Sequence, residues 1–184
     1  MPIESRKSLQ ALRMRVPGLA AQLIFWPLVA AGLVLDLWSK TAVFDWLQQR
    51  QSNSISIIDG FLQLVVAENA GAAFGIATGQ TQFLVVVSAV ALVGLFAVFL
   101  FSGTEQKLVH IAFGLFTAGV CGNLYDRIFN DGLVRDFIDI VYWPGRHWPA
   151  FNIADSMLCI AVALLLVSIF FTGKSSQKRA RQHK

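Results

Sequence analysis

Four runs of mostly apolar residues divide the chain, and each is about as long as a helix that crosses a bilayer. A transmembrane helix needs roughly 20 apolar residues in a row, because the hydrocarbon core is about 30 Å thick. Pro27 interrupts the first run, but neighbouring helices can tolerate a proline inside a span. The pattern therefore predicts four transmembrane helices, at about 18–38, 82–102, 107–128 and 152–172.

The composition agrees with a membrane protein. Of the 184 residues, 55% are hydrophobic and only 14% are charged, whereas soluble domains are usually about 25% charged. Because basic residues precede the first run, this run could instead be a cleaved signal peptide. It is too long for the apolar part of a signal peptide, and Asp36, Trp38 and Lys40 replace a small-residue cleavage site. We therefore interpret it as a retained span.

Positive charge is concentrated at the two ends of the chain. A basic tail can bind nucleic acid, but beside apolar runs it is typical of a segment held on the cytoplasmic face. Four spans place both ends on that face. The sequence thus predicts a basic cytoplasmic extension over 1–17, a membrane domain over 18–172 and a basic cytoplasmic tail over 173–184. The basic residues are Arg6, Lys7, Arg13, Arg15, Lys174, Lys178, Arg179, Arg181 and Lys184.

The two connections on the opposite side, 45–80 and 129–151, have features of their own. Residues 55–67 are β-branched and apolar with a break at Gly60, a pattern that predicts short strands. The second connection ends in the aromatic and proline-rich stretch YWPGRHWPAF. Aromatic residues at that level are typical of a membrane interface. We expect an all-α membrane bundle that carries a small extracytoplasmic strand region.

The polar residues of the spans gather at one depth. Ionisable residues inside a membrane are candidates for function. The first and third spans run outward and the fourth runs inward, so the polar groups of all three lie near the outer surface. Asp136, in the stretch GLVRDFIDI, is close enough in sequence to reach the same place. We expect a site between the helices, open to the outer surface, formed by Asp36, Lys40, Asn123, Asp126, Arg127, Asp136, Asn152 and Asp155.

Helical spacing also indicates that several of these groups lie on the same face of a helix. Gly119, Asn123, Asp126 and Arg127 recur at intervals of three and four residues, which places them on one side of the third span. Structural ion pairs are the competing interpretation. Asp36 lies four residues before Lys40 and can pair with it, and Asp126 can pair with Arg127 or Arg135. We favour the structural role for Asp36, Lys40 and Asp126.

Asp155 has a second interpretation as part of a helix cap. Asn is a preferred N-cap residue, so Asn152 can begin the last helix, with Asp155 complementing the helix dipole in the first turn. The residues by themselves leave this role and a functional role equally open. Asp131 and Asp139 are interpreted as solvated loop residues.

Among the reactive groups of the predicted site, the carboxylates are the remaining candidates for catalysis. Cys121 and Cys159 lie in apolar runs without a C-x-x-C motif, and the three histidines are scattered, so neither a metal nor a cofactor is predicted. Nucleophile and phosphate-loop motifs are not found. Two carboxylates held close together cannot both ionise easily, so the pair shares a proton. The ionised member can take a proton from water while the protonated member polarises a peptide carbonyl, which is acid–base hydrolysis.

At this point the motifs resemble those of a known family, the lipoprotein signal peptidases or signal peptidase II. The resemblance runs from about Asp36 to about Leu165 and rests on DLWSK, ENAGAAFG, AGVCGNLYDRIFNDGLVRDFIDI and FNIADS, in this order. It implies a bacterial inner-membrane aspartic endopeptidase that cuts the signal peptide from a prolipoprotein just before a diacylglyceryl-modified Cys. The implied fold is four transmembrane helices with both termini cytoplasmic, a small extracytoplasmic β-cradle and a short amphipathic helix.

The resemblance also implies roles for individual residues. Asp136 and Asp155 correspond to the catalytic pair, which the spacing had not distinguished from pairs that use Asp139. Residues that bind substrate or orient the site would be Asn69, Gly71, Asn123, Arg127 and Asn152, with Phe74 following Gly71. Asp36 and Lys40 match the D-x-x-x-K motif, and Asp126 lies within G-N-x-x-D-R. The one departure is Val120 and Cys121, which are bulkier than the usual small pair.

The expected partners follow from the same resemblance. They are a lipid-modified prolipoprotein and membrane lipids, with no nucleic acid, and the protein is expected to be a monomer whose active site faces the periplasmic or outer side. Two other functions compete with this one. A small transporter would need polar residues near the midplane, where this chain has few. A non-catalytic assembly or lipid-binding protein would use the carboxylates only as structural pairs.

Overall fold

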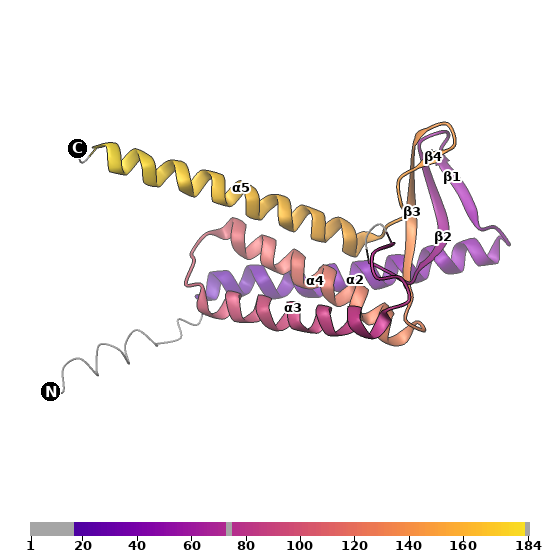
Figure 1. The fold of residues 1–184 in the computed structure, drawn as a ribbon, viewed down its shortest axis with the longest axis horizontal. Helices are drawn as coiled ribbons and strands as arrows, with labels where there is room; N and C mark the ends of the chain where they lie inside the picture. Colours follow the sequence, from indigo (N-terminus) through magenta and orange to yellow (C-terminus); the bar gives the residue numbers. More distant parts are fainter. Residues whose placement is uncertain (1–16, 73–74, 183–184) are drawn as a thin grey trace.

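The computed structural model describes residues 17–72 and 75–182, with side chains as far as Phe170. The predicted extension over 1–17, apart from Pro17, the side chains of the tail over 173–184, and Phe74 lie outside the described residues. Four described helices are long and apolar enough to cross a membrane, so a helix is confirmed at each of the four predicted spans (Figure 1). They are α2 (Leu19–Gln49), α3 (Thr81–Phe101), α4 (Lys107–Phe129) and α5 (Ile153–Gln182).

The first helix is longer than predicted. It does not end near residue 38 but continues to Gln49, so the connection that follows starts at residue 50 rather than 45. Asp36, Lys40, Phe44 and Leu47 are all buried and recur at helical spacing. The continuous apolar run ends at Trp38 because Ser39, Lys40 and Thr41 follow it, although the helix itself goes on.

A four-stranded antiparallel sheet stands at one end of the helix bundle (Figure 1). Its strands are β1 (Ser54–Ile58), β2 (Leu62–Asn69), β3 (Val134–Trp143) and β4 (Arg146–His147), in that order across the sheet. The strands predicted within 55–67 are confirmed, and Gly60 makes the turn between them with a φ of 73°. Within the described residues, the short amphipathic helix implied by the resemblance is not among the helices.

Strand β3 pairs the connection between α4 and α5 with the connection between α2 and α3, and this was not predicted. It pairs with β2 over most of its length, with Asp136 opposite Ala67 and Asp139 opposite Gln63. Asp139 is therefore buried at 7% exposure, and its Oδ2 lies 2.7 Å from Nδ1 of His147. The prediction that Asp139 is a solvated loop residue is wrong, because strand pairing turns its side chain to the covered face. Asp131 is exposed, as predicted.

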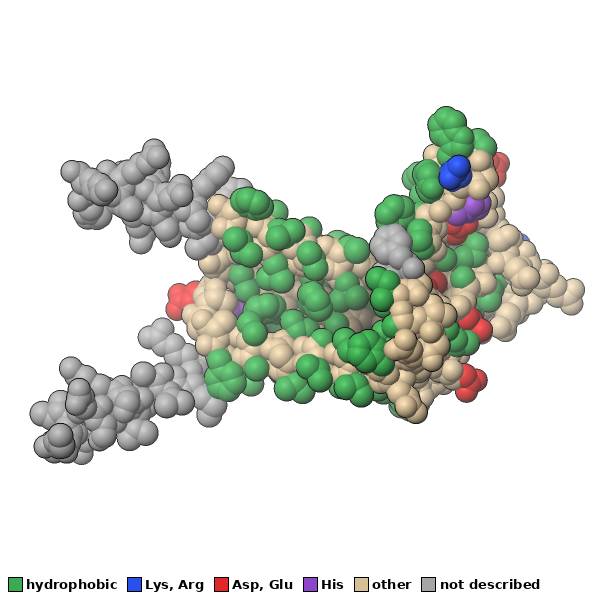
Figure 2. All heavy atoms as spheres, in the orientation of Figure 1, with side chains coloured by type: hydrophobic (Ala, Val, Ile, Leu, Met, Phe, Trp, Pro, Cys, Tyr) green, Lys and Arg blue, Asp and Glu red, His purple; other side chains and the backbone are tan. Residues whose placement is uncertain are grey.

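Helix α4 is the centre of the bundle, and small residues let its neighbours approach closely. A Cβ on Gly119 would lie 2.7 Å from the carbonyl oxygen of Ala154, and one on Gly122 would collide with the carboxylate of Asp36. Lipid tails are as apolar as the helices, so such close packing and hydrogen bonds have to hold membrane helices together. On the face shown in Figure 2, apolar side chains cover the sides of the helices, while the charged ones lie toward the ends of the molecule.

Candidate active site

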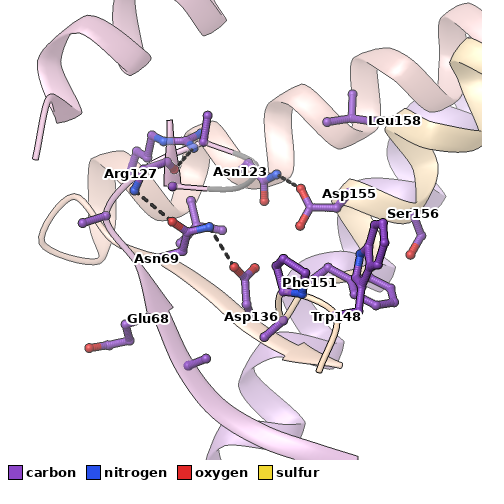
Figure 3. Close-up of a pocket in the computed structure, with 18 of the residues that line it drawn as sticks. Glu68, Asn69, Asn123, Arg127, Asp136, Trp148, Phe151, Asp155, Ser156 and Leu158 are labelled. Carbon is purple, nitrogen blue, oxygen red and sulfur yellow. Dashed lines mark hydrogen bonds between the residues drawn. The ribbon is translucent and has the colours of Figure 1, made fainter. Parts of the chain in front are cut away.

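A cavity of about 1080 Å³ lies where the sheet meets the helices (Figure 3). Strands β2 and β3, helix α4, the first turns of α5 and the loop after β2 all contribute to its lining. The sequence-predicted residues that line it are Asn69, Gly71, Asn123, Arg127, Asp136 and Asp155. The remaining predicted residues, which are Asp36, Lys40, Asp126 and Asn152, are fully buried behind this lining.

Asp136 enters the cavity from β3 and is held on both carboxylate oxygens. Asn69 Nδ2 donates to its Oδ2 over 3.1 Å, and Asn152 Nδ2 donates to its Oδ1 over 2.6 Å. The residue is only 2% exposed. Burial, followed by the negative charge of Asp155, raises the pKa of Asp136 to about 7, although the two amide hydrogen bonds oppose the shift. Near neutral pH, Asp136 therefore holds a proton much of the time.

Asp155 enters from the first turn of α5, and its carboxylate points into the same space as that of Asp136 (Figure 3). Asn123 Nδ2 donates to Asp155 Oδ1 over 2.7 Å. Asn152 caps the helix, since its Oδ1 accepts from the backbone N–H of Asp155 at 2.9 Å. Asp155 Oδ2 in turn accepts from the backbone N–H of Asn152 at 3.3 Å, which completes a capping box. The capping prediction is confirmed, and the same carboxylate lines the cavity.

The loop after β2 closes one side of the cavity. Asn69 Oδ1 accepts from the backbone N–H of Gly71 at 2.9 Å, and Arg127 Nη2 donates to the Gly71 carbonyl over 3.0 Å. A Cβ on Gly71 would lie 2.9 Å from the carbonyl oxygen of Ile76, so only glycine fits this tight turn. Asn69 thus bridges the loop to Asp136 through the two ends of one amide.

A network of buried charges supports the cavity from behind. Lys40 Nζ lies 2.7 Å from Asp36 Oδ2 and 3.2 Å from Asp126 Oδ2, and it donates to Asn123 Oδ1 over 3.1 Å. Asp36 Oδ1 accepts from the backbone N–H of Ala154 at 2.8 Å. The predicted pairing of Asp36 with Lys40 is confirmed. Because Lys40 occupies the oxygen of Asn123, it turns the amide nitrogen toward Asp155.

Of the two partners predicted for Asp126, Arg135 is correct. Arg135 Nη2 lies 2.7 Å from Asp126 Oδ1, while Arg127 turns toward the Gly71 loop. Helical spacing had grouped Arg127 with Asp126, but the two side chains leave the helix in different directions. A backbone rotation of about 100° separates adjacent helix positions, and here it divides the charge network from the cavity.

Several lining residues were not predicted. They are mostly apolar and include Trp148, Pro149 and Phe151 before α5, and Ser156, Leu158, Cys159 and Ile160 within it. The aromatic stretch before the last span was interpreted only as a membrane interface, although its position next to FNIADS was a usable signal. Among the described residues, no group of three or more histidines, cysteines and carboxylates is arranged to hold a metal ion.

Comparisons with known proteins identify the family. The family model of signal peptidase (SPase) II matches residues 28–171. A lipoprotein signal peptidase of Geobacter sulfurreducens is 40% identical over 149 residues, covering 79% of this chain and 91% of that protein. The lipoprotein signal peptidase of Neisseria gonorrhoeae is 33% identical over 157 residues, covering 84% and 93% of the two chains.

Solved structures agree with this assignment. One bacterial membrane enzyme superposes with a TM-score of 0.73 at 26% identity, covering 88% of this chain and 94% of that chain. A second superposes with a TM-score of 0.65 at 30% identity, covering 77% and 89%. The chain therefore belongs to the signal peptidase II family, whose members remove signal peptides from prolipoproteins.

Proposed function

We propose that the protein is an aspartic endopeptidase that uses Asp136 and Asp155 to activate water. Its substrate is a diacylglyceryl-modified prolipoprotein, cut just before the lipidated Cys. The observation that carries the proposal is that two carboxylates from different elements, β3 and α5, line one cavity, and that the pKa of Asp136 is raised to about 7. A carboxylic acid that keeps its proton beside an ionised partner is the arrangement that acid–base hydrolysis needs.

The two carboxylates would divide the work. Asp136, in its protonated form, donates a hydrogen bond to the scissile carbonyl oxygen and makes its carbon more electrophilic. Asp155 accepts a proton from the attacking water. Asn123 holds this carboxylate in place, because its Nδ2 donates to Asp155 Oδ1. Collapse of the tetrahedral intermediate returns that proton to the leaving amine. No covalent intermediate forms, and each proton ends on a product or on the pair.

The surrounding amides and Arg127 would hold the pair and the substrate. Asn69 and Asn152 fix Asp136 from two sides, and Asn123 fixes Asp155. Arg127 lines the cavity, and its Nη2 donates to the Gly71 carbonyl in the loop that closes one side of it. It would therefore hold the loop against the bound substrate. We expect Arg127→Ala to raise KM more than it lowers kcat.

The shape of the cavity supports a substrate that approaches from the membrane. Its lining continues from the carboxylates along α5 to apolar residues such as Leu158 and Ile160. A signal helix could enter sideways there, while the acyl chains of the substrate stay in the bilayer. The basic chain ends favour cytoplasmic termini by the positive-inside rule, which would place the sheet and the cavity on the periplasmic or outer side.

Cleavage of a purified lipidated precursor tests the proposal. We expect Asp136→Asn and Asp155→Asn each to lower kcat by about 1,000-fold or more, while both variants still unfold cooperatively in detergent. Asp131→Asn is the matched control, because Asp131 is an exposed carboxylate of the same outer region, and it should cleave normally. Normal turnover by either of the first two variants would exclude the pair, and a loss of folding in both would favour a purely structural role.

A further inference from the structure

We propose that Arg135 is a positioning residue that sets the location of Asp136 against three helices. The inference rests on the proposed role of Asp136, which Arg135 directly precedes in β3. No motif assigns a role to Arg135, and its side chain does not line the cavity. Its side chain is 17% exposed, so it is largely covered by the elements it contacts.

Arg135 contacts both oxygens of one buried carboxylate on α4. Its backbone N–H donates to Asp126 Oδ2 over 3.0 Å. Its Nη2 and Nε donate to Asp126 Oδ1 over 2.7 and 3.3 Å. Asp126 is fully buried. Main chain and side chain of the same residue are therefore fixed to one point on α4, which limits both the position and the rotation of the strand.

Contacts to the other two helices complete the attachment. Arg135 Nη1 donates to Thr41 Oγ1 on α2 over 3.2 Å. The Arg135 carbonyl accepts from Asn152 Nδ2 at the start of α5 over 3.3 Å, and the same nitrogen donates to Asp136. The residue beside Asp136 is thus joined to α2, α4 and α5. Because a misplacement of about 1 Å can lower an enzymatic rate about 100-fold, loosening this attachment should slow the chemical step.

Arg135 also balances the charge behind the site. The charged groups around it are Asp126 on α4, Asp36 and Lys40 on α2, and Glu68, which is opposite Arg135 on β2 and exposed. On the cavity side, Arg127 of α4 and Asp155 of α5 face Asp136. Asp36, Lys40, Asp126 and Arg135 carry a formal sum of zero. Without Arg135, the network carries one excess negative charge, which Lys40 and Asn123 connect to Asp155. An added negative charge disfavours ionisation of nearby carboxylates.

Two substitutions separate geometry from charge. We expect Arg135→Gln to lower kcat about 100-fold, with KM changed by less than about threefold, and to move the alkaline limb of kcat to higher pH by about half a unit. Arg135→Lys keeps the charge but loses the planar fork. The alkaline limb of its pH profile of kcat should therefore stay at the wild-type pH, while kcat itself falls about tenfold. Arg146→Gln is the control, because Arg146 is an exposed arginine of the same sheet.

Each outcome decides the inference. It is overturned if Arg135→Gln matches Arg146→Gln, if only KM rises, or if the loss of activity equals the loss of folded protein with an unmoved pH limb. If Arg135→Gln does not fold, kcat and the pH limb of Arg135→Lys decide. Asp136→Asn, assayed alongside, separates the two proposals. If it remains active, the proposed pair fails, whereas an inactive Asp136→Asn with a normal Arg135→Gln overturns the positioning role alone.

Discussion

The two ends of the helix bundle are held together in different ways. At the end away from the sheet, Phe25 is fully buried and stacks on Phe99 with ring centroids 4.0 Å apart, and Ala21 and Phe113 complete the cluster. At the sheet end, the fully buried groups include Asp36, Lys40, Asp126 and Asn152, beside the apolar Leu47. The same helices, α2 and α4, take part in both regions.

The two regions differ in how strongly their stabilising contacts depend on distance and angle. Dispersion contacts between rings are individually weak and hardly directional, so a side chain of similar volume can replace another. A buried ion pair or amide needs its partner at a fixed distance and angle, and removal of one partner leaves the other uncompensated. The apolar end therefore holds the bundle, and the polar end gives the carboxylates their positions.

The largest expected effect is a pH dependence at the sheet end. Since the pKa of Asp136 is raised from 3.8 to about 7, the folded protein keeps a proton that the unfolded chain loses within this window. The contribution of Asp136 to the free energy of unfolding should therefore fall as pH rises from about 4 to about 7, by about 4 kcal/mol. Denaturant titration in detergent over this range measures it. The Asp136→Asn variant should lack this component, and parallel curves for the two proteins would contradict the assignment.

One substitution at each end compares the two regions directly. Asp36→Asn keeps the volume but removes one charge from the network, so it should lower the free energy of unfolding by about 3 kcal/mol. Phe25→Leu exchanges one apolar side chain for another and should cost about 1 kcal/mol. The same titration measures both. Equal losses would mean that the charge network contributes no more directional stability than the aromatic cluster.

Two glycines make a smaller comparison. A Cβ at Gly122 would collide with the Asp36 carboxylate, whereas one at Gly94, on α3, meets nothing within 4 Å. Gly122→Ala should destabilise the protein by about 2 kcal/mol and reduce cleavage, because Asp36 also anchors the backbone N–H of Ala154. Gly94→Ala should leave both unchanged or slightly improved. A Gly122→Ala variant that behaves like Gly94→Ala would show that α2 and α4 separate easily.

The smallest effect concerns the pH profile of cleavage. Activity should fall about tenfold per pH unit above about pH 7 as Asp136 loses its proton. The hydrogen bond from Asn69 opposes the rise in the pKa of Asp136, so Asn69→Ala should move this limb to higher pH. Phe25→Leu should leave the limb in place. A limb that moves to lower pH in Asn69→Ala would mean that the amide stabilises the protonated form.

Much of the architecture could be predicted from local patterns. The four spans follow from runs of apolar residues, and the β1–β2 hairpin follows from β-branched residues around Gly60. The common depth of Asp36, Asn123 and Asp155 follows from the alternating direction of the spans. The capping role of Asn152 was readable because a capping box involves residues only three apart in sequence. The motifs that resemble signal peptidase II selected Asp136 as the partner of Asp155.

Tertiary structure alone decided three other features of the site. The burial of Asp139 requires β3 to pair with β2, from a connection far away in sequence. Asp126 pairs with Arg135 rather than the adjacent Arg127, because α4 and β3 meet where the chain turns back. Asn152 reaches Asp136 only when α5 packs beside the sheet. Sequence patterns record periodicity and depth, which are local properties, whereas the direction of a buried hydrogen bond depends on how separate elements pack.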